Sequence, residues 1–312
     1  MKPFLKLFIL LPLFFLAAAI GHSRLIVQSV KTQETDPRSV WQREIADLTR
    51  SRGVAQALAY VATRSRTDQA YQAVCHELMH EVGHQAYRLF LKENRVSVTT
   101  DGSACAFGFY HGVMEAWIGK GGDKSKAIAF CTMVDKTLGQ SKNSFYQCWH
   151  GIGHGAVVPH ERKLWGNPDG MVAPALTVCA RMASPGPEFT NCKSGVYAGV
   201  AIFIMENQYG LDLQSADPLA LCESEHEEGK IRCIGSMMPA LFKQWHHDMG
   251  QTWNILEERL PKALLVHAAN ALGSSAAIER ITLAIITAGC EHMGHPYSDS
   301  CLTGYKETQE LL

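Results

Sequence analysis

Four segments that each begin with a cysteine recur along the chain at a nearly constant spacing. They are CAFGFYHGVME from Cys105, CWHGIGHGAVV from Cys148, CKSGVYAGVAI from Cys192 and CIGSMMPALFK from Cys233. Successive segments start 43, 44 and 41 residues apart, and the first three carry glycine at the third and seventh positions after the cysteine. Such a fixed period is typical of repeat proteins, in which each repeat is one supersecondary unit.

The repeated segments are expected to form helices. Small residues four positions apart lie on one face of a helix, where they allow a neighbouring backbone to approach closely. Other apolar segments end in a cysteine, at Cys131, Cys179, Cys222 and Cys290. The predicted unit is therefore a helix, a loop, a helix that ends in cysteine, a short turn, and the cysteine that opens the next helix. Since strand-like alternation is scarce, we predict an all-α fold of stacked, solenoid-like α/α hairpins.

The ten cysteines are expected to form disulfides between neighbours in the sequence. Ten is an even number, and the repeat brings the two cysteines on either side of each turn together, although spacing alone does not fix the connectivity. The expected pairs are Cys75 with Cys105, Cys131 with Cys148, Cys179 with Cys192, Cys222 with Cys233, and Cys290 with Cys301.

This pattern resembles the cysteine-rich α/α repeat proteins of the tetratricopeptide-like superfamily. The resemblance covers roughly residues 105–301 and is carried by the period, the cysteine positions and the small residues. It implies disulfides that tie the helices of successive hairpins together. The chain departs from the family in its period, which exceeds the usual value of about 34 residues. It also departs in one turn, near residues 260–275, that carries no cysteine.

The N-terminal residues indicate export. Lys2 and Lys6 precede or flank an apolar run over residues 7–20, and three alanines at 17–19 provide a small-x-small cleavage site. Residues 1–19 are therefore expected to be a secretory signal peptide, and the alternative is an uncleaved anchor formed by residues 4–20. Disulfides are typical of the oxidising compartment that either would reach, so we expect a periplasmic or extracellular protein.

The rest of the chain divides by composition and motif. We expect a linker over residues 20–38, N-terminal helices that include a histidine-rich helix over 39–104, and the cysteine-containing repeats over 105–312. The chain has 29 basic and 30 acidic residues, for a net charge of −1, which argues against a nucleic-acid partner. Membrane contact is expected only if the N-terminal segment is not cleaved.

A helix predicted from Asp68 to about Glu93 contains the sequence CHELMHEVGHQAY. His76, His80 and His84 are each four residues apart, so they form one ridge on a single face. The HExxH pattern occurs twice, overlapping at His80. Two imidazoles at i and i+4 can bind one metal, while the glutamate beside the first can activate a bound water.

The second copy, HEVGH, resembles the zinc-binding helix of zincin metallopeptidases. That resemblance implies that His80 and His84 bind zinc and that Glu81 is the general base; in the first copy the corresponding glutamate is Glu77. In the copy that begins at His76, Gly83 fits the extended pattern HExxHxxGxxH, but Ala86 occupies the position of the third histidine. Zincins also bind substrate along an edge strand, and this sequence predicts few strands.

Histidines return on the predicted repeat helices. His111 and His154 both stand six residues after the cysteine of their repeat, and His111 with Glu115 and His150 with His154 are i, i+4 pairs. Equivalent positions of stacked repeats face the same surface, so these side chains could converge with the histidine-rich helix. The candidate metal ligands are His76, His80, His84, His111, Glu115, His150 and His154. Imidazoles with a carboxylate suit a divalent metal, zinc first, with iron or copper as alternatives.

Three functions stay open at this point. The first is an exported metal-binding repeat protein, either a metal store, sensor or carrier or a metal-dependent hydrolase. The second is a zincin-like metallopeptidase. The third is a scaffold whose concave surface binds a peptide or protein, with histidines that are only structural. A further zinc site at Cys290, His292, His295 and Cys301 would need reduced thiols, and export favours a disulfide there instead.

Overall fold

The computed structural model describes residues 37–93, 98–138, 142–159 and 161–310. Regular structure within these ranges is helical, without strands, as the sequence predicts. The predicted signal peptide or anchor over residues 1–19 lies outside the described residues, as does most of the predicted linker. Among the helices that are described, none combines the length and the apolar character needed to cross a bilayer.

The N-terminal helices differ in detail from the prediction. They are α2 (Pro37–Arg52), α3 (Val54–Thr67), α4 (Gln69–Ala73) and α5 (Cys75–Glu93). The single helix predicted from Asp68 is wrong, because the backbone at Val74 leaves helical geometry, with φ −122°, between α4 and α5. Asp68 caps α4 by accepting a hydrogen bond from the Tyr71 N–H at 3.1 Å. Helix α2 already contains Pro37, which was expected in the linker, because proline is tolerated in the first turn of a helix.

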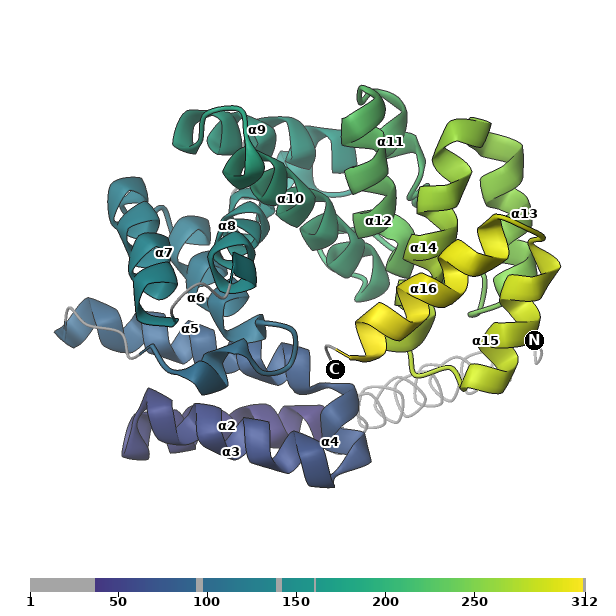
Figure 1. Cartoon of the computed structure of the whole chain (residues 1–312). Helices are drawn as coiled ribbons and strands as arrows, with labels where there is room; N and C mark the ends of the chain where they lie inside the picture. Colours follow the sequence, from purple (N-terminus) through teal and green to yellow (C-terminus); the bar gives the residue numbers. More distant parts are fainter. Residues whose placement is uncertain (1–36, 94–97, 139–141, 160, 311–312) are drawn as a thin grey trace, which may run out of the picture.

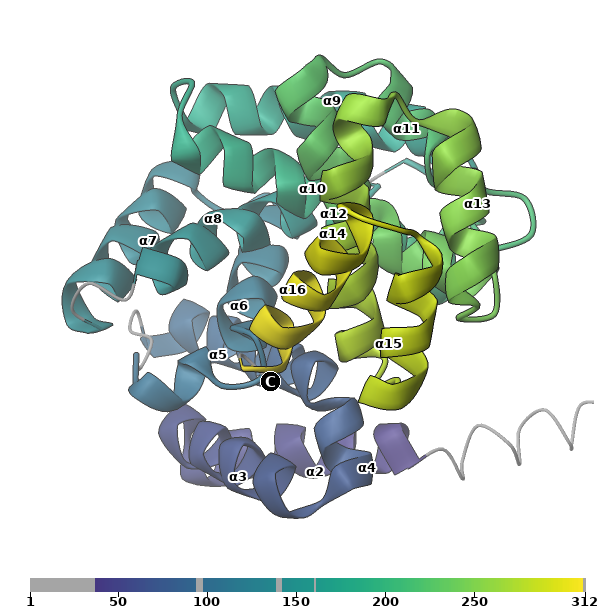
Figure 2. The same ribbon diagram turned by 45° about the vertical axis from the view of Figure 1, so that its right-hand side comes forward.

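A row of inner helices continues from α5. Its members, each packed on the one before, are α6 (Gly108–Gly119), α8 (Lys142–Val157), α10 (Pro187–Met205), α12 (Glu227–Gln244), α14 (Lys262–Ile278) and α16 (Tyr297–Gln309). The row is curved, so that α16 returns toward the N-terminal helices (Figures 1 and 2). Arg280, just after α14, donates a hydrogen bond at 2.8 Å to the side-chain oxygen of Gln72 on α4.

A second set of helices alternates with the inner row along the chain. These are α7 (Lys124–Leu138), α9 (Pro168–Met182), α11 (Ala220–Glu223), α13 (Met249–Arg259) and α15 (Leu283–His292), and each packs against the inner helix that follows it. Two short 3-10 helices, Thr100–Ser103 and Arg162–Leu164, lie in the connections. Helices α9 and α10 begin with Pro168 and Pro187 at a first-turn position that needs no N–H donor.

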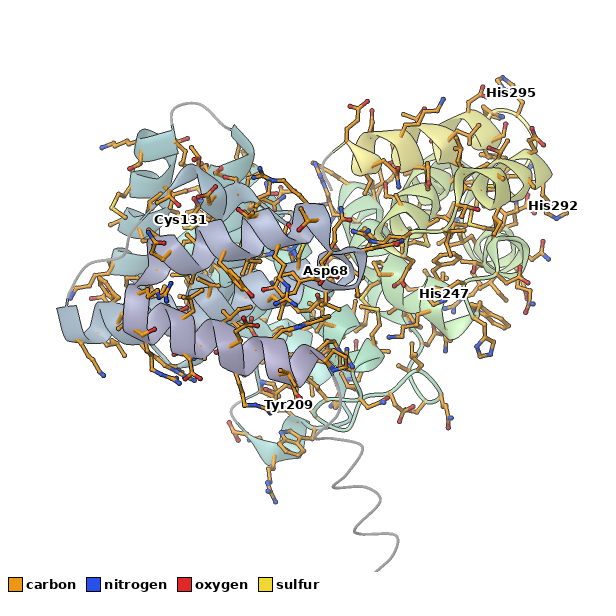
Figure 3. The ribbon with its side chains drawn as sticks, turned by 90° about the horizontal axis from the view of Figure 1, so that it is seen from below. Asp68, Cys131, Tyr209, His247, His292 and His295 are labelled. Carbon is orange, nitrogen blue, oxygen red and sulfur yellow. A yellow bond between two sulfur atoms is a disulfide. The ribbon has the colours of Figure 1, made fainter. Side chains whose placement is uncertain are left out.

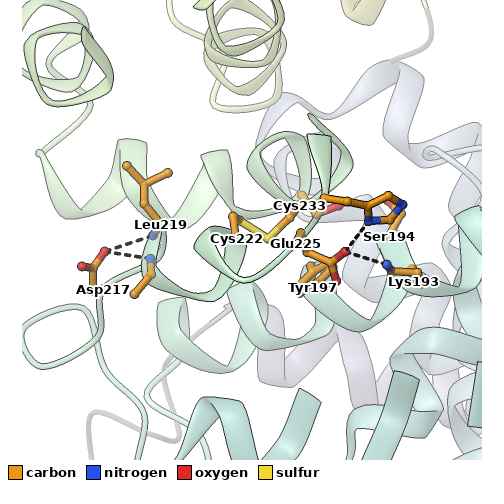
Figure 4. The surroundings of a disulfide bond; sticks show 11 residues. Lys193, Ser194, Tyr197, Asp217, Leu219, Cys222, Glu225 and Cys233 are labelled. Carbon is orange, nitrogen blue, oxygen red and sulfur yellow. Dashed lines mark hydrogen bonds and ion pairs between the residues drawn. A yellow bond between two sulfur atoms is a disulfide. The ribbon is translucent and has the colours of Figure 1, made fainter. Parts of the chain in front are cut away.

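The cysteines form the five predicted pairs, with Cα atoms 5.5–5.7 Å apart. Four bridges join a helix of the second set to the inner helix that follows it. Cys222 on α11 and Cys233 on α12 form one of these bridges in Figure 4. The fifth, from Cys75 to Cys105, joins the start of α5 to the residues before α6. The expectation that the second cysteine opens its helix is wrong for Cys148, Cys192, Cys233 and Cys301. They lie inside their helices, because the bridges connect helices that pack side by side.

One continuous hydrophobic core extends from Ile45 on α2 to Tyr305 on α16. The predicted N-terminal unit and the predicted repeats both contribute to it, and α2 and α3 pack on α5 at one end. Helix α5 therefore lies between the N-terminal pair and α6, which places its histidine ridge beside the first helices of the inner row.

Candidate metal centre

Close packing of α5, α6 and α8 brings histidines from three helices together. A Cβ atom at Gly112 on α6 would collide with the carbonyl oxygen of His80 on α5. A Cβ atom at Gly151 on α8 would lie 2.8 Å from the Cα of His111 on α6. The helix backbones can approach this closely only where a side chain is absent, and the histidines next to these glycines consequently share one site.

Three of the predicted ligands form the first group, His76 and His80 of α5 and His111 of α6. The Nε2 atoms of His76 and His80 lie 3.1 Å apart. The His111 ring centroid is 5.2 Å from that of His76 and 5.5 Å from that of His80. Each residue offers one nitrogen, and the three nitrogens lie within 4.8 Å of one another, so a single metal ion could contact all three.

The second nitrogen of each of these imidazoles is held by an oxygen acceptor. His76 Nδ1 donates to the backbone carbonyl of Cys105 at 2.9 Å, and His80 Nδ1 donates to Glu115 Oε2 at 3.0 Å. His111 Nε2 donates to the side-chain oxygen of Gln147 at 2.9 Å. These acceptors fix the tautomers and leave lone pairs on Nε2 of His76 and His80 and on Nδ1 of His111. Metal-bound histidines characteristically have such outer partners.

Burial keeps several imidazoles of the centre neutral. Burial, with the neighbouring His80, lowers the pKa of His76 to about 4. The same causes, burial first and then other histidines, hold the pKa of His111 and of His154 well below the ordinary value and lower that of His150 to about 3. A neutral imidazole has the lone pair that a metal requires. The Nδ1 of His111 is buried and has no hydrogen-bond partner, which is costly for a polar atom that binds nothing.

A second group shares His80 with the first and adds His84 and Glu115. Glu115 Oε2 lies 3.0 Å from His80 Nδ1 and 3.2 Å from His84 Nε2. Burial alone would raise the pKa of Glu115, but the hydrogen bonds from His80 and His84 hold it well below the ordinary value. Conversely, burial would lower the pKa of His84, and Glu115 with Glu81 raises it to about 9. This group combines the two histidines of HEVGH with a carboxylate from another helix.

His150 and His154 lie next to the first group without joining it. The His111 ring centroid is 4.9 Å from that of His150 and 5.3 Å from that of His154. The Nε2 of His154 is buried without a hydrogen-bond partner, and its ring centroid is 5.7 Å from that of His80. The histidines of α5, α6 and α8 therefore lie close together, as the repeat predicts. His150 and His154 lie beside the first group and are not part of it.

The two predicted catalytic glutamates differ in their surroundings. Glu81 is half-buried, accepts a hydrogen bond from Gln85, and has a carboxylate oxygen 3.9 Å from His84 Nδ1. Burial would raise its pKa, but His84 and Gln85 outweigh that effect and lower it. Glu77 is exposed. Only Glu81 thus lies against a residue of the centre with its carboxylate held in place.

Comparison with known protein families, with curated proteins and with solved structures gives no match. The function must be inferred from the residues and their geometry.

Sequence reasoning missed two acceptors of the centre, Gln147 and the carbonyl of Cys105. Gln147 also lines a cavity of about 720 Å³ between the first turns of α10 and α12. Its side chain therefore borders this cavity and accepts a hydrogen bond from His111 of the centre. Cys105, Ala106 and Phe107 all have left-handed φ values of 52° to 63°, and no glycine or asparagine signals this turn in the sequence. The turn directs the Cys105 carbonyl to His76.

The remaining histidine clusters lie elsewhere. His247, His292 and His295 are on the C-terminal half of the molecule (Figure 3). His292 and His295 are exposed, and the nearby cysteines form the Cys290–Cys301 disulfide, so no thiolate is available there for zinc.

Proposed function

We propose that this chain is an exported, solenoid-like repeat protein that binds a divalent metal at His76, His80 and His111. The observation that carries the proposal is the arrangement of their nitrogens. One nitrogen of each imidazole donates to an oxygen acceptor at 2.9–3.0 Å, and each residue has a nitrogen within 4.8 Å of one from each of the other two. Five disulfides support export, since such bridges persist in oxidising compartments.

The spacing of the donors supports a small ion. Zinc binds imidazole nitrogen at about 2.0–2.1 Å, which in a tetrahedral site separates two donors by about 3.3 Å. The 3.1 Å between the Nε2 atoms of His76 and His80 is close to that value. The fourth position would be taken by water or by the unpartnered Nε2 of His154 after a small movement. Zinc is the first choice, and iron and copper accept the same ligands.

The test is the metal content of protein purified from an oxidising compartment. We expect bound zinc, copper or iron, and a rise in melting temperature when metal is restored to chelated protein, because a ligand of the folded state stabilises it. His111→Ala should lose the ion. The control His267→Ala removes an exposed histidine from α14 and should leave metal content unchanged. A parent protein that binds no metal and gains no thermal stability would refute the proposal and favour the scaffold, whose ligand would be a peptide or protein on the concave surface.

A zincin-like metallopeptidase is the second candidate. His80, His84 and Glu115 make a ligand set of two histidines and one carboxylate, which catalytic zinc sites use, and Glu81 stands beside His84 as the base. The described residues include no strand along which a substrate peptide could pair. Glu81→Gln should retain metal and abolish turnover if the protein is a peptidase. Failure of metal-loaded parent protein to cleave a broad peptide library would exclude this candidate while leaving metal binding intact.

A further inference from the structure

We propose that the centre holds two metal ions and that the His80 imidazole bridges them. This inference rests on the proposed metal-binding function and adds a second ion, bound by His84 and Glu115. It follows from the position of His80, which belongs to both ligand groups and directs Nε2 to His76 and Nδ1 to Glu115.

The two nitrogens of His80 face separate sets of ligands. Nε2 lies 3.1 Å from the Nε2 of His76, on the side of the first group. Nδ1 lies 3.0 Å from Glu115 Oε2, on the side of the second. Because the ring nitrogens of an imidazole diverge, the rigid ring separates the two sites and can contact an ion on each side.

The second side offers three protein donors of the appropriate kind. Glu115 comes from α6 and His84 from α5, and the Nε2 of His84 lies 3.2 Å from the same carboxylate oxygen that faces His80. These separations are close to the value of about 3.3 Å expected between donors on a tetrahedral ion. The side chains are 12%, 30% and 26% exposed for His80, His84 and Glu115, so solvent can supply a further ligand.

The charges and protons of the bridged state balance. The second ion takes the place of two protons, the one between His80 Nδ1 and Glu115 and the one that His84 Nε2 donates to the same carboxylate, and both leave to solvent. His80 then carries a lone pair on each nitrogen as an imidazolate, with one negative charge, and the Glu115 carboxylate carries another. The positive charge of the two divalent ions is therefore balanced in part by two anionic ligands, as a partly buried site requires.

The alternative is a single ion in the first group, with Glu115 acting only as the outer partner of His80. The two arrangements differ in stoichiometry and in the role of His84. They can therefore be separated with Zn²⁺ and Cu²⁺ as probes.

The experiment titrates chelated, disulfide-intact protein with Zn²⁺ and counts bound ions after removal of excess. We expect two ions in the parent and in the control His267→Ala. His84→Ala and Glu115→Gln should each retain one ion, and His111→Ala should also lose one. With two equivalents of Cu²⁺, paramagnetic resonance should show magnetic coupling through the imidazolate, which His84→Ala abolishes. Circular dichroism and the melting curve of each metal-free variant verify its fold.

A parent with one ion that His84→Ala and Glu115→Gln leave in place would overturn the second site and keep the proposed function. Two ions without magnetic coupling would overturn the bridge. A parent with no ion would refute the proposed function itself.

Discussion

The backbone of α6 at Gly112 lies directly against the carbonyl oxygen of His80 on α5, in a space where no side chain fits. This crossing determines how far His111 stands from His76 and His80, because His111 immediately precedes Gly112. Helix packing and ligand geometry are consequently coupled at one residue.

Substitution of Gly112 should therefore affect both stability and metal binding. We expect Gly112→Ala to lower the free energy of unfolding by about 1–3 kcal/mol, the usual cost of overpacking a tight interior. Metal affinity should fall as well, since α6 must move away from α5. Denaturant unfolding and a metal titration measure the two effects. The matched control is Gly235→Ala on α12, where a Cβ would have no neighbour within 4 Å. Gly235→Ala should stabilise α12 slightly. Equal effects of the two variants on the free energy of unfolding and on metal affinity would contradict the coupling of packing and metal binding at Gly112.

The hydrogen bond from His111 to Gln147 should tune metal affinity without providing a ligand. We expect Gln147→Leu to weaken binding by about 10–100-fold, the usual effect of losing an outer partner of a metal-bound histidine. The number of ions at saturation should stay the same. Competition with a coloured chelator measures the affinity, and Gln251→Leu, on the exposed surface of α13, is the control. An unchanged affinity for Gln147→Leu would show that this hydrogen bond does not orient the ligand.

The bridge between α11 and α12 should contribute substantially to stability. Removing Cys222 and Cys233 together by substitution with alanine is expected to lower the free energy of unfolding by about 2–4 kcal/mol. Helix α11 spans only Ala220–Glu223, and the bridge ties it covalently to α12. Denaturant unfolding under non-reducing conditions measures the loss. Peptide mapping of the parent without reduction should recover the Cys222–Cys233 peptide, and a peptide that links either cysteine elsewhere would refute the pairing.

Glu225 should make stability depend on pH in the acidic range. Its carboxylate accepts hydrogen bonds from Lys193 at 2.8 Å and from the Tyr197 hydroxyl, beside the Cys222–Cys233 bridge (Figure 4). Burial would raise its pKa, but Lys193 and Tyr197 outweigh burial and lower it. A lowered pKa in the folded state means that the unfolded chain binds the proton more tightly. The stabilisation is therefore complete above the unfolded pKa and is lost as the pH falls through the folded value.

The measurement compares parent and Glu225→Gln in denaturant unfolding from pH 7 to pH 3. The parent should be the more stable at pH 7, and the difference should shrink below about pH 4.3, the ordinary glutamate pKa. A difference that is constant across this range would exclude the carboxylate charge as its origin.

Features that repeat along the chain could be predicted from the sequence. The cysteine pairs follow from a regular spacing, and the shared position of His111 and His154 within their repeats correctly indicated one common location. Both inferences depend on periodicity, which the sequence displays directly.

Features that depend on a single local conformation could not be predicted. The break at Val74 and the left-handed turn at Cys105 carry no glycine or proline that would mark them. Gln147 was missed because an amide that orients a ligand has no characteristic spacing. That His80 presents its two nitrogens to different partners depends on the side-chain rotation and hydrogen bonds of a folded site, which the HExxH pattern does not specify.

Each disulfide joins cysteines that are consecutive in the sequence, separated by 11 to 30 residues. A chain that enters an oxidising compartment with its N-terminus first would present them in order. When the second cysteine of a pair emerged, its partner would be the only thiol that had not yet reacted, so oxidation during such a translocation would select the native pairing without later reshuffling. Maturation of this protein should therefore require an oxidant more than an isomerase.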